Sequence, residues 1–340
     1  MFKKHFKYYK SKCPPPDLSN VINFRDAEFE KHQKVKRVEL KDKNIDDLTN
    51  FGLKPINMWK MYEIADSPGF FVIPDPFTGT GQRYWIQRCL RDFTMKPHSR
   101  LNLDAHGDLM KGEDWWETCC KYDVRSQNLL KKLRWATLGY HHDWDTKVSC
   151  DCSFEQLRGR RQIDVACGQI GETRSDRQVY SEFARDPFPT DLATVCKYVC
   201  EAVGFPSFSA EAAIVNFYHL DSTLSGHTDH SEEDVTAPLL SFSFGQTAIF
   251  LLGGTTMDDE PSAVYLHSGD VAIMSGRSRL CYHGVPRIVL DTIQPWHLEL
   301  DRDSEDSWIP FEKYVMSSRI NVNVRQVLRQ GQKSLSSVAS

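Results

Sequence analysis

Three residues in the second half of the chain have side chains that could bind a metal ion. His227 and Asp229 are two positions apart in a stretch that we expect to be extended, where alternate side chains point to the same face. His283, much later in the chain, supplies a second imidazole. Two imidazoles and one carboxylate form a facial triad that holds iron(II) and leaves adjacent positions open. The open positions suit a bidentate 2-oxo acid and dioxygen, which is the chemistry of a non-haem oxygenase.

A second set of polar residues occurs on the expected strands before and after these ligands. Asn216 and Tyr218 share one strand face, and Arg319, Asn321 and Arg325 share another. The far carboxylate of a 2-oxo acid needs a fixed cation, and the planar guanidinium of Arg319 suits it through paired hydrogen bonds. We expect Arg325 to reach either the metal-side carboxylate or Asp229. The five polar residues therefore predict a 2-oxoglutarate site beside the iron.

The elements that must position these residues follow from the apolar pattern. Four short strand-like segments separated by turns lie between Asp229 and His283, as hairpins require. We therefore expect an α+β protein with a double-stranded β-helix, or jelly roll, as its core, with supporting helices and an N-terminal extension. The four segments are Pro238–Gly245, Thr247–Gly253, Ala263–Ser268 and Val271–Ser275. Further expected elements are the strands Phe70–Pro74 and Ala212–Tyr218 and the helices Gln82–Met95 and Thr190–Gly204.

The motifs that contain these residues resemble a known family, the AlkB-type nucleic-acid dioxygenases. The likeness is greatest to the animal AlkB homolog 1 subgroup and covers roughly residues 52–330. The matching segments are Asn-x-Tyr at 216–218, His-x-Asp at 227–229, Pro-Leu-Leu-Ser-Phe-Ser-Phe-Gly-Gln at 238–246, Ala-Ile-Phe-Leu-Leu-Gly-Gly at 248–254, His-Ser-Gly-Asp at 267–270, Ser-Arg-Leu at 278–280 and Arg-x-Asn-x-x-x-Arg at 319–325.

The resemblance implies an Fe(II)- and 2-oxoglutarate-dependent dioxygenase that uses O2 to demethylate nucleic acid. The subgroup acts on N6-methyladenine in DNA and on 1-methyladenine and 5-methylcytosine in tRNA. Because the target base must leave the stack, we expect bulged, looped or single-stranded DNA or tRNA as partner. The resemblance also implies a location in the nucleus, the mitochondrion or both. An alternative keeps the chemistry and changes the substrate to a protein side chain, as in a histone demethylase or a hydroxylase.

Three aromatic residues are candidates for contact with the extruded base. Trp135 and Tyr140 lie in a segment similar to the substrate lid of the family, and Tyr180 matches a tyrosine that covers the pocket in the subgroup. An aromatic face stabilises an unstacked base by about 1–3 kcal/mol. Ordinary strand packing is the alternative for Trp135 and Tyr140. Ser231 stands where bacterial AlkB-like proteins carry an acid, which favours removal of a neutral methyl group over repair of a cationic lesion.

Length and composition fit one large domain, because 340 residues with 40% hydrophobic side chains can bury a sizeable core. We expect a partly mobile extension at 1–51, the dioxygenase domain at 52–330 and a disordered tail at 331–340. The mostly polar stretch 148–178 interrupts the family pattern and is expected to be an inserted loop. It is either a mobile connection or an additional contact for nucleic acid.

The charge of the chain gives no general signature of nucleic-acid binding, because the net value is −4. Any contact with phosphates must therefore come from a local basic surface. Residues 2–12 contain five lysines and no acid. They form either an arm that serves targeting or touches nucleic acid, or a solvated amphipathic helix that ends at Pro14, and we favour the helix.

The cysteines indicate a reducing, intracellular setting. Ten cysteines show no regular framework, and no secretory or long apolar segment occurs near the start of the chain. We expect free thiols, with Cys196 and Cys200 facing the core at helical spacing. We also expect a monomer that does not associate with membranes.

Overall fold

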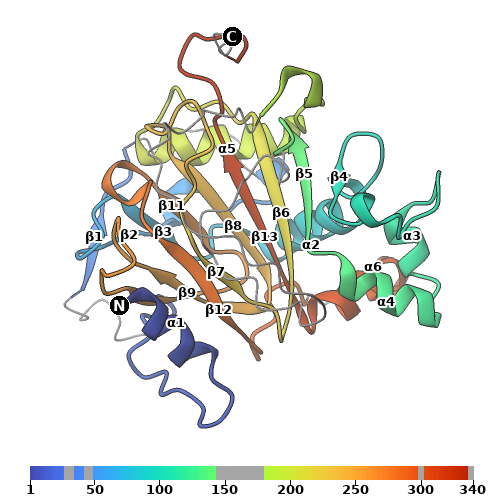
Figure 1. Ribbon diagram of the computed structural model, residues 1–340, viewed down its shortest axis with the longest axis horizontal. Helices are drawn as coiled ribbons and strands as arrows, with labels where there is room; N and C mark the ends of the chain where they lie inside the picture. Colours follow the sequence, from blue (N-terminus) through green and yellow to red (C-terminus); the bar gives the residue numbers. More distant parts are fainter. Residues whose placement is uncertain (27–33, 42–48, 143–179, 298–301, 336–340) are drawn as a thin grey trace, which may run out of the picture.

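The computed structural model describes residues 1–26, 34–41, 49–142, 180–297 and 302–335, and the strands within these ranges lie at its centre (Figure 1). In the first half of the chain the strands are β1 Val35–Val38, β2 Met61–Ile64, β3 Phe70–Ile73, β4 Arg100–Leu101 and β5 Trp135–Gly139. In the second half they are β6 Ala212–His219, β7 Leu224–His227, β8 Leu239–Gly245, β9 Thr247–Leu252, β10 Ser262–Leu266, β11 Val271–Met274, β12 His283–Val289 and β13 Ser318–Arg325.

The strands form two antiparallel sheets. One has nine strands in the order β1-β2-β3-β11-β8-β13-β6-β5-β4, and the other has four in the order β10-β9-β12-β7. Strands β6 to β13 contribute four members to each sheet, and apolar side chains from both sheets meet in one buried cluster. This arrangement is the predicted jelly roll. The four strands predicted between the metal ligands are observed as β8 to β11, each within two residues of its expected ends.

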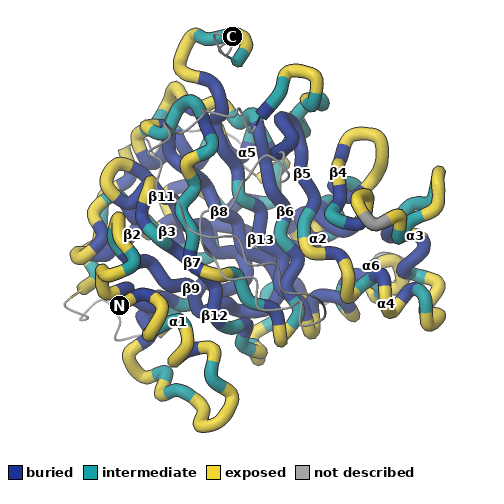
Figure 2. The backbone as a smooth tube through the Cα atoms, viewed as in Figure 1, coloured by how far each residue is buried: buried dark blue, intermediate teal, exposed yellow. Residues whose placement is uncertain are grey.

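Helices cover the outer face of the nine-stranded sheet. Side chains of α2, α5 and α6 pack with alternate residues of β6, β8 and β13 in the largest buried cluster, which appears as dark blue strands in Figure 2. The predicted helix α5 ends where Gly204 adopts a φ of 99°, a left-handed conformation that glycine tolerates. The helices on this side are α2 Gly79–Gln87, α3 Trp115–Cys119, α4 Val124–Lys132, α5 Thr190–Val203 and α6 Arg302–Val315.

Helix α6 was not among the elements that the sequence predicted. Pro310 lies inside this helix, and proline normally breaks a helix because it lacks a backbone N–H. Trp308 and Phe311 on either side of it are buried, and the Phe311 ring stacks on Trp116 with centroids 4.8 Å apart. Burial against the core therefore outweighs the local penalty.

The residues expected in an N-terminal extension pack on the jelly roll where the structure describes them. Helix α1, Phe2–Lys10, lies on the outer face of the four-stranded sheet (Figure 1). Phe2 is 1% exposed, and it packs with Tyr9 and residues of β9 and β10. Arg287 of β12 donates hydrogen bonds to the carbonyls of Tyr9 and Ser11 at the end of the helix. The helix is thus only half solvated, which corrects the expectation of a solvated one.

Two other expectations fall partly outside the described residues. The inserted loop at 148–178 lies wholly outside them, and so does the end of the tail at 336–340. The described part of the tail contacts the domain, since the Leu335 amide donates to Glu182. Cys196 and Cys200 are buried on α5, and the cysteines of the described ranges are free thiols, as predicted. No helix in these ranges is long and apolar enough to cross a membrane.

We expect Phe2→Ala to detach α1 while the jelly roll remains folded. The Phe2 ring fills space beside Gly226 and Gly253, where an added Cβ would lie 2.5 Å and 2.8 Å from ring atoms. Loss of a buried phenylalanine ring costs about 3–5 kcal/mol, more than a short helix gains by itself. Hydrogen exchange of the α1 amides measures the effect, with the exposed Lys4→Ala as control. Equal protection in both variants would contradict this account of the docking.

Candidate metal centre

Strands β7 and β12 bring the two predicted histidine ligands together. His227 ends β7 and His283 begins β12, and the two residues are direct partners in the antiparallel ladder. Asp229 follows two positions after β7, and its carboxylate oxygens lie 3.8 Å from Nε2 of His227 and 3.6 Å from Nε2 of His283. One ligand atom of each residue lies within 4.8 Å of the others. This spacing fits a single metal ion.

Both imidazoles are oriented through their second nitrogen. Nδ1 of His227 lies 3.0 Å from the carbonyl oxygen of Ser225, and Nδ1 of His283 lies 3.1 Å from that of Cys281. A carbonyl can only accept, so each Nδ1 donates its proton and each Nε2 offers a lone pair toward Asp229. Burial and then the His227 ring lower the pKa of His283 to about 4. The ring is therefore neutral at pH 7, as a metal ligand must be.

The carboxylate of Asp229 is held in its charged form. Burial alone would raise its pKa, but the charge of Arg325 holds the pKa of Asp229 well below its usual range. Nη2 of Arg325 lies 3.0 Å from Oδ2 of Asp229. The structure thus places Arg325 at one of the two positions expected for it. The donor set of two neutral imidazoles and one carboxylate fits iron(II).

Two residues that were not predicted to belong to the site, Glu232 and Arg279, hold Asp229 in place. Glu232 is buried and accepts hydrogen bonds from Arg279 at 2.9 Å and from the Tyr180 hydroxyl at 3.0 Å. Nε of Arg325 lies 3.4 Å from the same carboxylate. Arg279 also donates to the backbone carbonyl of Asp229 at 2.6 Å. The sequence contains two signals that could have identified these residues. Glu232 is an acid three positions after Asp229, and Arg279 belongs to the matched Ser-Arg-Leu segment.

A narrow cavity between the two sheets extends from His283 to Arg319. Arg319 is 1% exposed and donates to the carbonyl of Leu266 at 3.0 Å and to Oγ of Ser243 at 2.8 Å. Its Nε has no hydrogen-bond partner, and no carboxylate among the described residues forms an ion pair with it. Burial lowers the pKa of Arg319 to about 10, so the guanidinium remains charged at pH 7. A buried cation without a carboxylate at ion-pair distance suits an anionic ligand.

The other predicted co-substrate residues divide between this cavity and the surface. Tyr218 and Asn321 line the cavity, and Asn321 donates to Oγ of Ser241 at 2.7 Å. Burial raises the pKa of Tyr218, which keeps its hydroxyl protonated as a donor. Asn216 pairs with Asn321 across the ladder but lines an outer cleft together with Trp135. The structure therefore brings three of the five residues, Tyr218, Arg319 and Asn321, to this cavity, and it places Arg325 beside Asp229.

Comparison with known proteins decides the family. The sequence model of the 2OG-Fe(II) oxygenase superfamily matches residues 155–325. The chain belongs to this superfamily. It is 37% identical to the nucleic acid dioxygenase ALKBH1 of Mus musculus over 97% of this chain and 85% of that protein. It is 30% identical to the DNA N(6)-methyladenine demethylase ALKBH1A of Arabidopsis thaliana, over 96% of this chain and 94% of that protein. It is also 30% identical to the tRNA demethylase abh1 of Schizosaccharomyces pombe, over 96% of this chain and 95% of that protein.

Membership of this superfamily confirms the predicted resemblance and the enzyme class. The chain is an Fe(II)- and 2-oxoglutarate-dependent dioxygenase, and O2 is its oxidant. The His-Asp-His group is the one cluster of three such ligands found among the described residues. The reaction class therefore agrees with the geometry that the strands produce.

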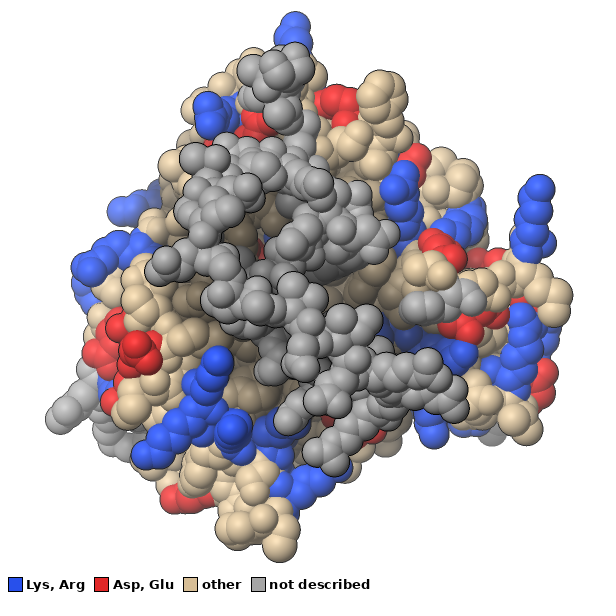
Figure 3. Space-filling model, in the orientation of Figure 1, with Lys and Arg blue, Asp and Glu red and all other residues tan. Residues whose placement is uncertain are grey.

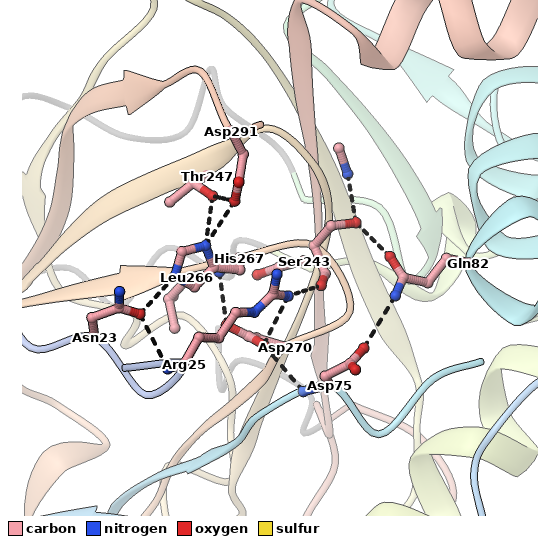
Figure 4. Close-up of polar contacts among 12 residues, drawn as sticks. Asn23, Arg25, Asp75, Gln82, Ser243, Thr247, Leu266, His267, Asp270 and Asp291 are labelled. Carbon is pink, nitrogen blue, oxygen red and sulfur yellow. Dashed lines mark hydrogen bonds and ion pairs between the residues drawn. The ribbon is translucent and has the colours of Figure 1, made fainter. Parts of the chain in front are cut away.

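The N-terminal segment contacts residues next to the cavity wall at Leu266. His267, next to Leu266, contacts Asp291 and Asn23, each at 2.9 Å (Figure 4). It is a hydrogen-bonded histidine outside the metal cluster. Arg25 lies 3.7 Å from Asp270, which in turn accepts a hydrogen bond from the His267 amide. Residues far apart in the sequence thus support the wall behind Arg319.

The three aromatic residues expected to contact a base occupy different environments in the dioxygenase. Tyr140 and Tyr180 are buried, with rings in a T-shaped contact at 6.4 Å. The Tyr140 hydroxyl donates to Glu182, and the Tyr180 hydroxyl donates to Glu232. Neither ring has a free face on which a base could stack, because both rings are packed in a hydrophobic cluster. Trp135 is half-buried and lines the outer cleft, so the base contact stays a prediction for this residue.

Proposed function

We propose that this dioxygenase demethylates nucleic acid by oxidation. The observation that carries the proposal is the triad of His227, Asp229 and His283 in a chain whose relatives are named for DNA and tRNA demethylation. These three residues would hold iron(II). When bound, iron and 2-oxoglutarate supply the oxidation of a substrate C–H bond, with succinate and carbon dioxide as by-products.

The protein's own side chains position the co-substrate. The guanidinium of Arg319 would pair with the far carboxylate of 2-oxoglutarate, and the protonated Tyr218 hydroxyl would donate to the same ligand. Apolar residues of both sheets, including Leu239 of β8 and Phe250 of β9, line the cavity and would exclude water. Arg325 holds Asp229 in its charged form, and Glu232 holds Arg325 and Arg279 in place beside it. These contacts explain how 2-oxoglutarate would be oriented beside the triad.

The substrate would enter through the outer cleft. Trp135, Asn216 and Tyr218 line this cleft, which has a volume of about 740 Å³. Tyr218 and Leu224 line both the cleft and the inner cavity, so the two spaces adjoin. A base that stacks on Trp135 would present its N-methyl group toward the triad. Hydroxylation of that group gives an unstable product that releases formaldehyde.

We expect N6-methyladenine or 1-methyladenine in a bulge or loop to react faster than the same base in a continuous duplex. Extrusion from a duplex costs a few kcal/mol, and each 1.4 kcal/mol is about tenfold in rate. Mass spectrometry of nucleosides after incubation with matched bulged and duplex strands measures the difference. Methylated histone peptides serve as the control for the protein-directed alternative. Equal rates on both strand forms would contradict extrusion as the limiting step, and turnover of peptides alone would overturn the proposal.

A further inference from the structure

One wall of the substrate cleft is the N-terminal helix α1. Lys3, Lys7 and Lys10 line the cleft from this helix, and Arg134 and Trp135 line it from the opposite side. The three lysines are spaced i, i+4 and i+7 and therefore share one face of the helix, which we call the lysine face. Figure 3 shows Lys and Arg side chains gathered over the position of α1.

The lysine face is available for a ligand. All three side chains are exposed, and no acid among the described residues forms an ion pair with them. Asp221 is the acid that lines the cleft, against four basic residues. The cleft is therefore a basic channel on a chain whose net charge is −4. Such a local concentration of lysines is what phosphate contacts require.

The helix that carries these lysines is held in place on its other side. Phe2 and Tyr9 are buried against the four-stranded sheet, and the amide of Phe2 donates to the carbonyl of Met257 at 3.0 Å. Arg287 binds the carbonyls at the opposite end of the helix. The lysines thus project from a fixed support beside the metal site, so a ligand would not have to order this segment.

We propose that the lysine face of α1 binds the sugar–phosphate backbone of the strand that carries the methylated base. Lys3 and Lys10 are separated by about 10 Å along the helix axis, at 1.5 Å per residue. This separation matches about three stacked nucleotides of one strand. The backbone would lie between α1 and Arg134, and the target base would turn toward Trp135. The proposal deepens the proposed function and rests on it.

An anionic lipid surface is the competing partner for a lysine-rich helix, and the packing argues against it. A helix that lies on a membrane inserts its apolar face among the lipids. The apolar residues Phe2, Phe6 and Tyr9 instead pack against the protein. The lysines also line a concave cleft, which admits a polymer strand more readily than a bilayer.

The test is a triple variant, Lys3→Gln, Lys7→Gln and Lys10→Gln, in the full chain loaded with iron and 2-oxoglutarate. The probe is a fluorescent single-stranded oligonucleotide with one N6-methyladenine. Each phosphate contact on a single strand contributes about 0.7 to the slope of log affinity against log salt. We expect the slope to fall by about 2 and the affinity at ~0.1 M salt to weaken about 100-fold. Lys-to-Arg exchange at the same three positions should restore both values.

A matched control carries the same change of charge away from the cleft. Lys4→Gln, Lys36→Gln and Lys121→Gln lie on exposed positions, and none of these lysines lines the cleft. The control variant should keep the wild-type slope. Equal loss in both triple variants would overturn the proposal, since it would show a general effect of charge. An unchanged slope in the lysine-face variant, or binding to phosphatidylserine vesicles in place of the oligonucleotide, would also overturn it.

Failure of this inference is distinguishable from failure of the proposed function. If the wild-type enzyme demethylates the oligonucleotide and the lysine-face variant binds it equally well, only the inference fails. If the wild-type enzyme binds the oligonucleotide through the lysine face without demethylating it, only the proposed function fails. Succinate release without nucleic acid should be equal in the wild-type enzyme and in the control variant, because Lys4, Lys36 and Lys121 do not line the cleft.

Discussion

We expect Asp229→Ala to abolish iron-dependent succinate release. Asp229 is the only carboxylate of the triad. Its removal leaves two imidazoles, which carry no negative charge to balance the charge of Fe(II). Loss of a residue that only supports a ligand already lowers metal affinity or activity by about 10–100-fold, so loss of the ligand itself should exceed this. Iron content after anaerobic reconstitution and the rate of succinate formation are the two measurements.

The same substitution should also destabilise the fold, for a reason visible only in the structure. Arg325 would lose the carboxylate that lies 3.0 Å from its Nη2. Removal of one partner of a buried ion pair costs about 3–5 kcal/mol, and the remaining contact with Glu232 offsets part of this. Thermal unfolding of the metal-free proteins measures this effect separately from catalysis. Loss of turnover with unchanged stability would show that Glu232 alone neutralises Arg325.

His230→Ala is the matched control, because His230 is exposed and lies next to Asp229 in sequence. It should retain both iron and succinate formation at the wild-type level. Wild-type turnover by Asp229→Ala would refute the assignment of the triad. Equal losses in the two variants would point to a disturbed loop instead of a lost ligand.

The parts of the site that could be predicted from the sequence depend on regular backbone geometry. The two-residue period of β13 places Arg319 and Arg325 on one side, whereas Asp229 lies beyond the end of β7, in the segment that follows the strand. Continuous apolar segments predicted β8 to β11 because both faces of these strands are buried. Local periodicity and a terminal glycine likewise predicted α5.

The parts that could not be predicted depend on partners far away in the chain. Helix α1 docks because Gly226 and Gly253 leave room for the Phe2 ring, and no local pattern records that fit. Tyr180 has an aromatic ring that could stack on a base, but its hydroxyl donates a hydrogen bond to the buried Glu232. Burial of Trp308 keeps α6 helical despite its proline. In each case a contact with residues far away in the sequence decides the local structure or the role of the side chain.

Arg319→Lys should raise the KM for 2-oxoglutarate by about 10–100-fold with little change in kcat at saturation. Hydrogen bonds to charged groups contribute about 1.5–3 kcal/mol, and an ammonium cannot reproduce the paired donors of a guanidinium. Arg319 is the residue for this role because its charge has no carboxylate partner among the described residues, whereas Arg325 already lies against Asp229 and Glu232. Arg277→Lys, at an exposed position, is the matched control and should keep the wild-type KM.

The pH dependence of this variant provides a second, independent measurement. Burial disfavours the charged form of a cation and lowers the pKa of Arg319 to about 10. A lysine in the same place starts from a lower value than arginine and therefore loses its proton sooner as the pH rises. The KM of the variant should increase further from about pH 7 to pH 9, the range in which the wild-type guanidinium stays charged. A KM that is unchanged by the substitution at every pH in this range would remove Arg319 from the co-substrate site.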